Sequence, residues 1–236
     1  MPGVKASEAL RREQILKSAH EVALRKGIDG VTVRAVAARA RVSHGLVLFH
    51  FTRKEQLVSA LLDRVLASTL SIRVPDDVAL MRDPGERLVA LLRQEVHRLS
   101  RDAAQVRLFL EYWALGTRQK AVGEKISAEL RSYREVLRLL AADTLLTGPT
   151  RWVGVTPEGL AAVGASLIHG CALQAMIDPA HFDVEEHLMA VEGLLGPSPP
   201  RSQTRSTGRR GAAGSMLGSV ETGAAALRRG QPKLVQ

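Results

Sequence analysis

Residues 32–51 read TVRAVAARARVSHGLVLFHF, and this stretch holds two short runs of helix-forming residues with a break between them. Thr32 has the side chain of a good N-cap and predicts a helix over 33–40. Ser43 can cap a second helix that runs to about residue 49. Helices of this length are not stable alone in water, so longer flanking helices must hold the pair. The segment therefore predicts two short helices joined by a tight turn.

The outward positions of this segment carry side chains that can donate hydrogen bonds. They are Arg34, Arg39, Arg41, Ser43 and His44. Donors of this kind suit phosphates and base edges, so the pattern favours DNA binding. Gly45 inside a helix costs about 1 kcal/mol relative to alanine, which makes sense where the backbone must approach another surface closely. An ordinary helical hairpin is the alternative interpretation.

Longer helices are expected on both sides of the segment. The preceding helix is predicted over 8–26, because its apolar residues recur at three- and four-residue spacing. On the other side, Thr52 to Glu55 reads as a capping box that opens a long helix, which Pro75 would stop. Three helices within residues 1–53 would thus form a compact head.

The chain from residue 54 to 195 predicts only further helices. Their expected N-caps are Asp83, Asp102, Thr117, Thr156 and Asp183, and Gly148-Pro149 would close the helix that follows Thr117. No segment shows the sustained alternation of a strand. The fold class is therefore all-α, with a three-helix head over 1–53 on a larger helical body over 54–195.

Positive charge is concentrated at the two ends of the chain. The net charge is +9, and both 1–60 and 196–236 hold an excess of Lys and Arg, whereas 61–195 hold slightly more acidic residues. A basic head suggests that the N-terminal part meets a polyanion. Residues 196–236 contain few large apolar side chains and are expected to form a disordered basic tail. Such a tail either adds non-specific DNA affinity or has no function.

The head segment resembles the TetR family of transcriptional regulators, whose members share the pattern IA..AGVS.G.LY.HF..K..L. The matching residues are Thr32, Val36-Ala37, Ala40, Val42-Ser43, Gly45, His50-Phe51, Lys54 and Leu57. The resemblance implies a helix-turn-helix head that binds a double-stranded DNA operator. It also implies a repressor that a small-molecule effector releases from that operator.

The resemblance assigns roles to single residues of the head. Ser43, His44 and Gly45 would lie at the groove-facing start of the recognition helix, and His50 would lie near its end. Lys54 would contact a phosphate. Thr32 would cap the second helix and touch the DNA backbone, and Phe51 would be buried.

Two positions depart from the family pattern. Arg41 replaces the usual turn glycine, so the turn must accept a side chain, which can add a phosphate contact. Leu48 replaces the usual tyrosine and removes a hydroxyl donor, with Phe49 beside it. The expected DNA-binding residues are Thr32, Arg34, Arg41, Ser43, His44, Gly45, Leu48, Phe49, His50 and Lys54.

The resemblance further implies an effector pocket among the middle helices, roughly over 81–140. Its candidate residues are Met81, His97, Phe109, Tyr112, Trp113 and Tyr133. They include half of the eight Phe, Tyr and Trp residues of the chain, which fits a mostly apolar pocket. For each of them taken singly, ordinary core packing is the alternative.

Residues 159–177 carry no charge over 19 positions, which formally resembles a membrane span. Eight of the 19 residues are Ala or Gly and the run contains polar residues, so we expect a buried or dimer-forming helix and no membrane partner. Gly159, Ala162, Gly164, Ala165 and Gly170 would let another helix approach closely. With 183–195, this helix would form the family's four-helix interface, which predicts a homodimer through 157–195 and a pseudo-palindromic operator.

The sequence does not favour an enzyme, a metal site or a cofactor. Its seven histidines form no HExxH or similar pair, and it has no Gly-rich phosphate loop and no GxSxG. The single Cys171 fits a reducing, cytoplasmic compartment, and residues 1–9 carry no apolar stretch and so predict no secretory signal. The alternatives to a repressor are a helical dimeric interaction module and a transcriptional activator.

Overall fold

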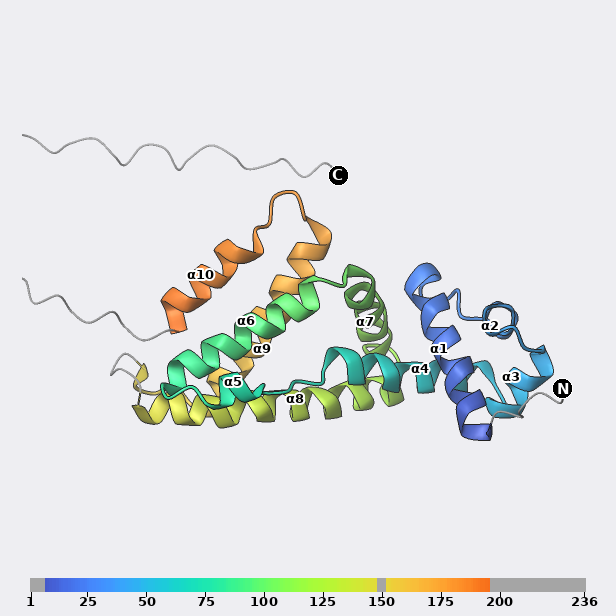
Figure 1. Ribbon diagram of the computed structural model, residues 1–236, viewed down its shortest axis with the longest axis horizontal. Helices are drawn as coiled ribbons and strands as arrows, with labels where there is room; N and C mark the ends of the chain where they lie inside the picture. The colour runs from blue at the N-terminus through green and yellow to red at the C-terminus, as the bar shows by residue number, and fades with distance from the viewer. Residues whose placement is uncertain (1–6, 148–151, 196–236) are drawn as a thin grey trace, which may run out of the picture. The chain divides into compact units, whose positions relative to one another are not determined.

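The computed structural model describes residues 7–147 and 152–195, and the regular structure within those ranges is helical throughout (Figure 1). The predicted all-α class is thereby confirmed. The helices are α1 (Glu8–Lys26), α2 (Val33–Ala40), α3 (His44–His50), α4 (Lys54–Thr69), α5 (Asp76–Ala79), α6 (Pro84–Ser100), α7 (Ala103–Gly116), α8 (Lys120–Thr147), α9 (Pro157–Ile177) and α10 (Val184–Leu195).

The short helices α2 and α3 begin where their caps predict. The Thr32 hydroxyl oxygen accepts a hydrogen bond from the Ala35 amide at 3.1 Å, and the Ser43 hydroxyl oxygen accepts one from the Leu46 amide at 3.2 Å. Between them Arg41 adopts the left-handed conformation, with φ 55° and ψ 47°. This conformation ends α2 and turns the chain into α3, as glycine does at many helix C-termini.

The head packs around a small apolar centre between α1, α2, α3 and the start of α4. Ile15, Val36, Val47 and Leu57 are completely buried there. Phe51 follows α3 and is only 2% exposed, and the guanidinium of Arg12 lies 4.7 Å from the centre of its ring. The second short helix is thus anchored through Val47 and Phe51, while its remaining residues stay at least partly accessible.

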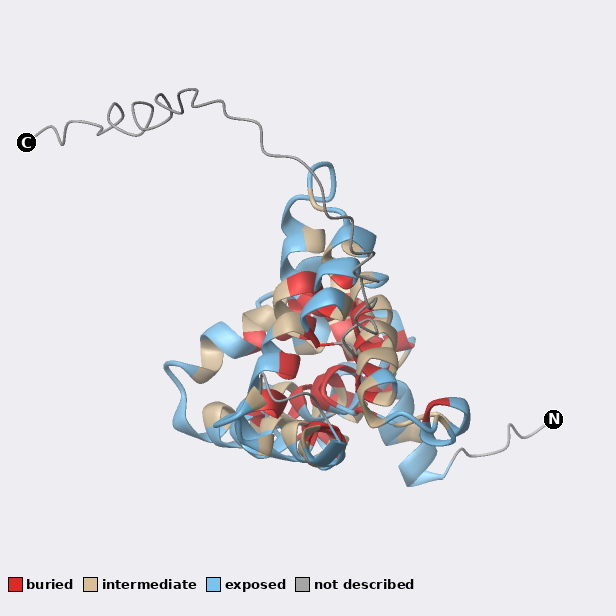
Figure 2. Ribbon diagram, turned by 90° about the vertical axis from the view of Figure 1, so that its left-hand side faces the viewer, coloured by how far each residue is buried: buried red, intermediate tan, exposed pale blue. Residues whose placement is uncertain are grey.

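The body is built around α6, α8 and α9, which pack against one another. Figure 2 shows buried residues gathered where helices of the chain face one another. A Cβ atom added at Gly164 of α9 would lie 3.1 Å from a methyl group of Leu92, so the small residue permits close packing on α6. By length and composition α9 could cross a membrane, but its buried face makes it a core helix of this fold.

Helix α4 connects the head to the body, because it packs against α1 and also against α7 and α8. Helix α10 packs on α6 through charged side chains. Arg93 of α6 pairs with Glu185 at 3.0 Å and also with Glu192. These contacts place α10 beside α9, where both helices keep part of their surface exposed.

Several predicted boundaries are wrong. Helix α4 starts one residue later than the capping box requires, with Arg53 as an N-cap that makes no side-chain hydrogen bond. It ends at Thr69, and the unpredicted α5 follows Pro75. Thr117 ends α7, donating its hydroxyl hydrogen to the Ala114 carbonyl at 2.8 Å, and does not cap α8. The predicted stop at Gly148-Pro149 and the predicted tail lie outside the described residues.

Candidate functional site

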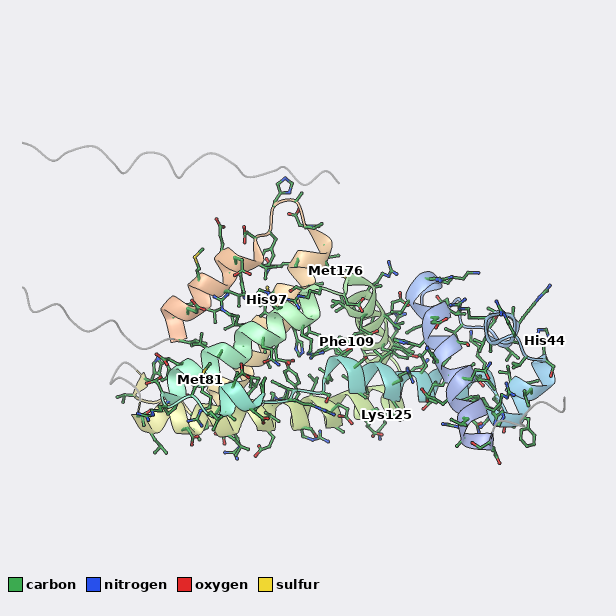
Figure 3. The ribbon with its side chains drawn as sticks, in the orientation of Figure 1. His44, Met81, His97, Phe109, Lys125 and Met176 are labelled. Carbon is green, nitrogen blue, oxygen red and sulfur yellow. The ribbon has the colours of Figure 1, made fainter. Side chains whose placement is uncertain are left out.

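The outer face of α3 and the residues around it are exposed. Ser43, His44 and Gly45 are exposed at the start of α3, and His44 lies at the edge of the head (Figure 3). Leu48 is 44% exposed and Phe49 is 72% exposed, although both are large apolar side chains. The ring of His50 contacts that of Phe49 edge-on, with 5.2 Å between the centroids. A helix with this much accessible surface is free to enter a groove.

Four basic side chains surround α3 without an ion pair among the described residues. They are Arg34, Arg41, Arg53 and Lys54, and all four are exposed. Arg53 is absent from the predicted set, although its position at the N-terminus of α4 beside Lys54 was visible in the sequence. Arg39, which the sequence places on the outer face, instead forms an ion pair with Glu21 of α1. Its guanidinium therefore helps to hold α2 on α1.

The body contains a cavity of about 290 Å³ between α4, α6, α7 and α9. Two of the six predicted pocket residues, Phe109 and Trp113, line it. The complete lining consists of Thr69, Leu99, Val106, Phe109, Leu110, Trp113, His169, Gly170, Ala172 and Leu173. The contribution of α9 was not expected, because the sequence analysis assigned that helix to the dimer interface.

Four rings meet at one side of this cavity. Phe109 and Trp113 pack edge to face, with centroids 5.3 Å apart and an angle of 87°. His169 stacks on Tyr133 at 5.3 Å and 29°. Burial, and secondarily the positive charge of Arg98, lowers the pKa of His169 to about 4 from its usual 6.5. The imidazole is therefore neutral at pH 7.

A buried carboxylate lies behind the rings. Glu95 is 1% exposed, binds the guanidinium of Arg98 at 2.6 Å and accepts a hydrogen bond from the Tyr133 hydroxyl at 3.3 Å. Burial raises the pKa of Tyr133, so its hydroxyl stays protonated as a donor. Arg98 also donates to the carbonyls of Ser68 and Thr69, at 2.7 and 3.0 Å. Both charges are thus satisfied within the protein.

The other predicted pocket residues lie elsewhere. Tyr112 donates to the Val58 carbonyl at 2.9 Å and lines a different cavity, of about 410 Å³, against α4 and α8. The Nε2 atom of His97 lies 3.4 Å from a carboxylate oxygen of Glu185 of α10. Met81 follows α5, and Figure 3 shows it apart from Phe109. None of these three lines the cavity around His169.

Polar contacts join α7 to α1 of the head. The side-chain amide oxygen of Gln105 lies 2.9 Å from Nε2 of His20, and the guanidinium of Arg107 donates to the backbone carbonyl of Leu24 at 2.6 Å. Further along, a carboxylate oxygen of Glu111 accepts from the Ile28 amide at 2.7 Å. These contacts tie one face of α7 to the head while another face of the same helix lines the cavity.

Gln105 also connects this contact to the wall of the cavity. Its side-chain amide donates to the hydroxyl oxygens of Ser68, at 2.6 Å, and of Thr69, at 3.3 Å. Because the amide nitrogen is used in this way, its oxygen is left to accept from Nε2–H of His20. Thr69 of the cavity wall and His20 of the head are therefore linked through one buried side chain.

Part of the surface of α9 and α10 is apolar and exposed. Val163 is 49%, Ile177 is 71% and Met189 is 60% exposed. A Cβ atom added at Gly170 or Gly193 would have no heavy atom within 4 Å, so the described chain leaves space at both positions.

A metal site was not predicted. Residues 7–147 and 152–195 contain no cluster of three His, Cys, Asp or Glu side chains placed to hold a metal ion.

Comparison with known proteins assigns both parts of the chain to one group. Residues 15–61 match the family described as bacterial regulatory proteins, tetR family. Residues 84–196 match the family described as BetI-type transcriptional repressor, C-terminal. The two matches together include the recognition segment, every residue that lines the cavity except Thr69, and both helices with the exposed apolar surface.

Individual relatives agree with this assignment. The chain is 30% identical over 128 residues to an HTH-type transcriptional regulator of the dhlA 5′ region in Xanthobacter autotrophicus, covering 54% of this chain and 63% of that one. It is 30% identical over 114 residues to the HTH-type transcriptional regulator BetI of Burkholderia lata, covering 48% and 58%. The chain thus spans about six tenths of the curated relatives it matches.

A solved structure shows the same fold. A transcriptional regulator from Saccharomonospora viridis in complex with choline has a TM-score of 0.64 and 19% sequence identity to this chain, covering 78% of this chain and 95% of that one. These relatives are helix-turn-helix regulators and not enzymes, and the head on its helical body defines the same class here. The chain belongs to the TetR family.

Proposed function

We propose that the protein is a homodimeric transcriptional repressor that binds a pseudo-palindromic DNA operator through its two heads and is released by a small-molecule effector. The observation that carries DNA binding is the exposed face of α3 surrounded by four basic side chains with no ion pair among the described residues. Charges left in this state are available to neutralise phosphates, whereas paired charges are not.

The contacts to DNA divide into two kinds. Ser43, His44 and Gly45 at the start of α3 reach base edges in the major groove, followed by Leu48, Phe49 and His50 along the helix. Arg34, Arg41, Arg53 and Lys54 contact phosphates, and Thr32 lies at the cap of α2 beside them. Lys54 sits at the N-terminus of the 16-residue α4, where the helix dipole also favours a phosphate.

The dimer uses the exposed apolar surface of α9 and α10. Val163, Ile177 and Met189 would be covered in the dimer, and Gly193 leaves space for a close helix contact. A two-fold axis through this surface gives an isologous interface and presents two heads to two half-sites. Sedimentation of the full chain tests the dimer, and Ile177→Glu is expected to shift it towards monomer.

The effector binds in the cavity around His169 and acts on the head through α7. Filling the cavity changes the position of α7, and the contacts of Gln105, Arg107 and Glu111 pass that change to α1. The ligand must bind the DNA-free arrangement better than the DNA-bound one, because only this difference shifts the equilibrium. The choline complex of the related structure supports a small-molecule effector as a class.

The experiment is a gel shift of the full chain on DNA from upstream of its own gene, with excess competitor DNA. The double variant His44→Glu/Lys54→Glu is expected to abolish the discrete complex. The matched control is Arg131→Glu/His181→Glu, which makes the same kind of charge change at exposed positions of the body. If both double variants bind as wild type does, the helix-turn-helix does not carry the affinity and the proposal fails.

The direction of regulation needs its own measurement. A reporter gene placed behind the bound DNA is expected to be more active when the protein is absent. Higher activity in the presence of the protein would identify an activator instead. A chain that never forms a competitor-resistant complex on genomic fragments would be a helical interaction module.

A further inference from the structure

The walls of the cavity around His169 are almost entirely apolar. Its lining residues come from α4, α6, α7 and α9, and only Thr69, Trp113 and His169 among them have a side chain with a polar atom. Thr69 already accepts a hydrogen bond from Gln105 through its hydroxyl oxygen. A ligand in this cavity therefore meets mainly Leu, Val, Ala, Phe and Trp side chains.

No charged group of the lining is available to a ligand. Glu95 and Arg98, the charges behind the ring cluster, are bound to each other at 2.6 Å. The carboxylate of Glu95 also accepts from Tyr133, and the remaining donors of Arg98 are directed at two backbone carbonyls. An ionic ligand would lose its hydration here without gaining a counter-charge, which is strongly unfavourable.

His169 carries the one side-chain hydrogen-bond acceptor of the lining that lacks a partner among the described residues. Its Nε2 atom is buried and has no hydrogen-bond partner among the described residues. The ring is held in place by stacking on Tyr133 and by contacts with Phe109 and Trp113. Buried polar atoms without partners are rare in folded proteins, so the imidazole of His169, a residue that lines the cavity, is a group that a ligand can complete.

Burial and Arg98 keep this imidazole neutral at pH 7, because they lower its pKa to about 4. A neutral imidazole carries one donor and one acceptor nitrogen. A hydroxyl group can donate to Nε2 in one tautomer and accept from it in the other. It is therefore the simplest ligand group that pairs with this atom in either case.

We propose that the cavity binds an uncharged, largely apolar molecule, such as a small aromatic alcohol, whose hydroxyl group hydrogen-bonds to the imidazole of His169. This inference rests on the proposed effector function and names the chemistry of its ligand. The cavity of about 290 Å³ equals the liquid volume of roughly ten water molecules, which suits a single aromatic ring with a short side chain. Trp113 and Leu173, 38% and 39% exposed, mark its opening.

A quaternary ammonium ligand fits this cavity less well. Cation–π binding needs ring faces turned to the charge. Here Phe109 and Trp113 form a T-shaped pair, in which the edge of one ring occupies a face of the other, and one face of the Tyr133 ring is covered by His169. The positive charge of Arg98, which disfavours protonation of His169, also disfavours a ligand cation beside it. The ligand of this chain should therefore differ in charge from choline.

The test is calorimetric titration of the full chain at pH 7 with four compounds of nearly equal size. They are 2-phenylethanol, ethylbenzene, phenylethylammonium and phenylacetate. We expect 2-phenylethanol to bind about tenfold more tightly than ethylbenzene, which lacks the hydroxyl, and more tightly still than the two ions. Tighter binding of either ion or of choline, or no binding of the alcohol, would overturn the inference.

Variants of His169 test the hydrogen bond itself. His169→Phe keeps a flat ring on Tyr133 but removes the nitrogen, and is expected to bind the alcohol and ethylbenzene equally. His169→Gln restores a polar atom and should recover part of the preference, while the exposed His181→Gln should behave as wild type. A preference that persists in His169→Phe, with thermal melts showing a folded protein, would contradict the inference.

The same proteins separate this inference from the proposed function. DNA binding is measured on the wild type without ligand, and calorimetry is measured without DNA. If the wild type does not bind DNA but binds the alcohol, the proposed function fails and the ligand inference holds. If it binds DNA but not the alcohol, the ligand inference fails and the protein is a DNA-binding protein with a different effector.

Discussion

The basic side chains around α3 of the head and those of α6 of the body are used in opposite ways. Around α3, Arg34, Arg41, Arg53 and Lys54 have no ion pair among the described residues. In the body, Arg93 binds two carboxylates of α10, and Arg98 binds Glu95 and two carbonyls. The ion pairs of Arg93 and Arg98 hold helices of the body together, whereas the four basic side chains around α3 remain solvated, where a polyanion can reach them.

Apolar side chains show the same contrast. In the head, Phe51 is buried while its near neighbour Phe49 is 72% exposed. In the body, Phe109 is 4% exposed and lines a cavity. Exposed large apolar residues are informative where they gather at an otherwise polar, basic surface. The head therefore keeps the Phe49 ring on its outer face, where we propose that DNA binds, and the body keeps the Phe109 ring at a cavity, where we propose that a ligand binds.

The largest effect is expected from the two phenylalanines of the head. Phe51→Ala removes a buried ring and should lower the free energy of unfolding by about 4 kcal/mol. Phe49→Ala should change it by less than about 0.5 kcal/mol, because the ring is exposed, yet weaken operator binding. Chemical denaturation and gel shifts measure the two effects. If Phe51→Ala and Phe49→Ala lower the free energy of unfolding equally, the distinction between a buried and an outer face of this segment is wrong.

The second prediction concerns pH and the buried histidine of the body. His169 has a pKa of about 4 in the folded protein and about 6.5 when exposed. Between these values the unfolded chain binds a proton that the folded chain does not, so stability falls as the pH is lowered from 6.5 towards 4. The loss attributable to this group is about 3 kcal/mol.

The groups that face His169 set the control for this measurement. They are Arg98, which remains charged, Glu95, which is paired with it, and Tyr133, whose hydroxyl stays protonated. His169→Phe should remove this part of the acid destabilisation, measured by urea denaturation at pH 7 and pH 5. His181→Gln, at an exposed position, should keep it. An unchanged pH dependence in His169→Phe would show that the histidine is not responsible.

The third prediction tests the link between the two regions. Gln105→Met keeps the size of the side chain but removes its hydrogen bonds to His20, Ser68 and Thr69. We expect it to reduce the effect of a bound ligand on operator affinity by about 1–2 kcal/mol of coupling energy. Anisotropy titrations with labelled operator, with and without 2-phenylethanol, measure this quantity. Operator affinity without ligand should change little.

A control for the third prediction is available on the same interface. Arg107→Met removes the contact to the Leu24 carbonyl but does not touch the cavity wall. It should reduce the coupling less than Gln105→Met does. If Arg107→Met has the larger effect, the signal passes through α7 as a whole and not through the Thr69–Gln105–His20 contacts.

Most of the head could be predicted from sequence because its structure is determined locally. Thr32 and Ser43 cap their helices through the amide three residues later, and such contacts depend only on neighbouring residues. The same local rule succeeded at Asp83 and Asp102 of the body. It failed at Thr117, because a threonine between two helices can end the first as well as begin the second.

The ligand cavity was predicted less well because long-range packing determines it. Phe109 and Trp113 were found through the scarcity of aromatic residues, but His169 was missed. A single histidine in an uncharged helix was the signal, and it was overlooked because that helix was assigned only to dimerisation. His97 has similar chemistry in the sequence, yet the fold turns it towards Glu185 of α10. Sequence spacing gave no means of separating these two histidines.

The smallest effect is expected at the turn between α2 and α3. Arg41 has a left-handed backbone conformation, which disfavours a residue with a Cβ atom by about 1 kcal/mol. Arg41→Gly relieves this strain but makes the unfolded chain more flexible, so the net gain in stability should be below about 1 kcal/mol. If the side chain contacts a phosphate as proposed, the same variant loses operator affinity and becomes less sensitive to salt.

The two measurements at Arg41 therefore have opposite expected signs. A more stable protein that binds the operator less tightly would mean that the arginine is kept at this strained position for its contact with DNA. Arg41→Asn provides the matched control, because asparagine tolerates the left-handed conformation but has no charge. If both variants bind the operator as wild type does, Arg41 is a residue of the turn alone. The phosphate contacts would then come from Arg34, Arg53 and Lys54.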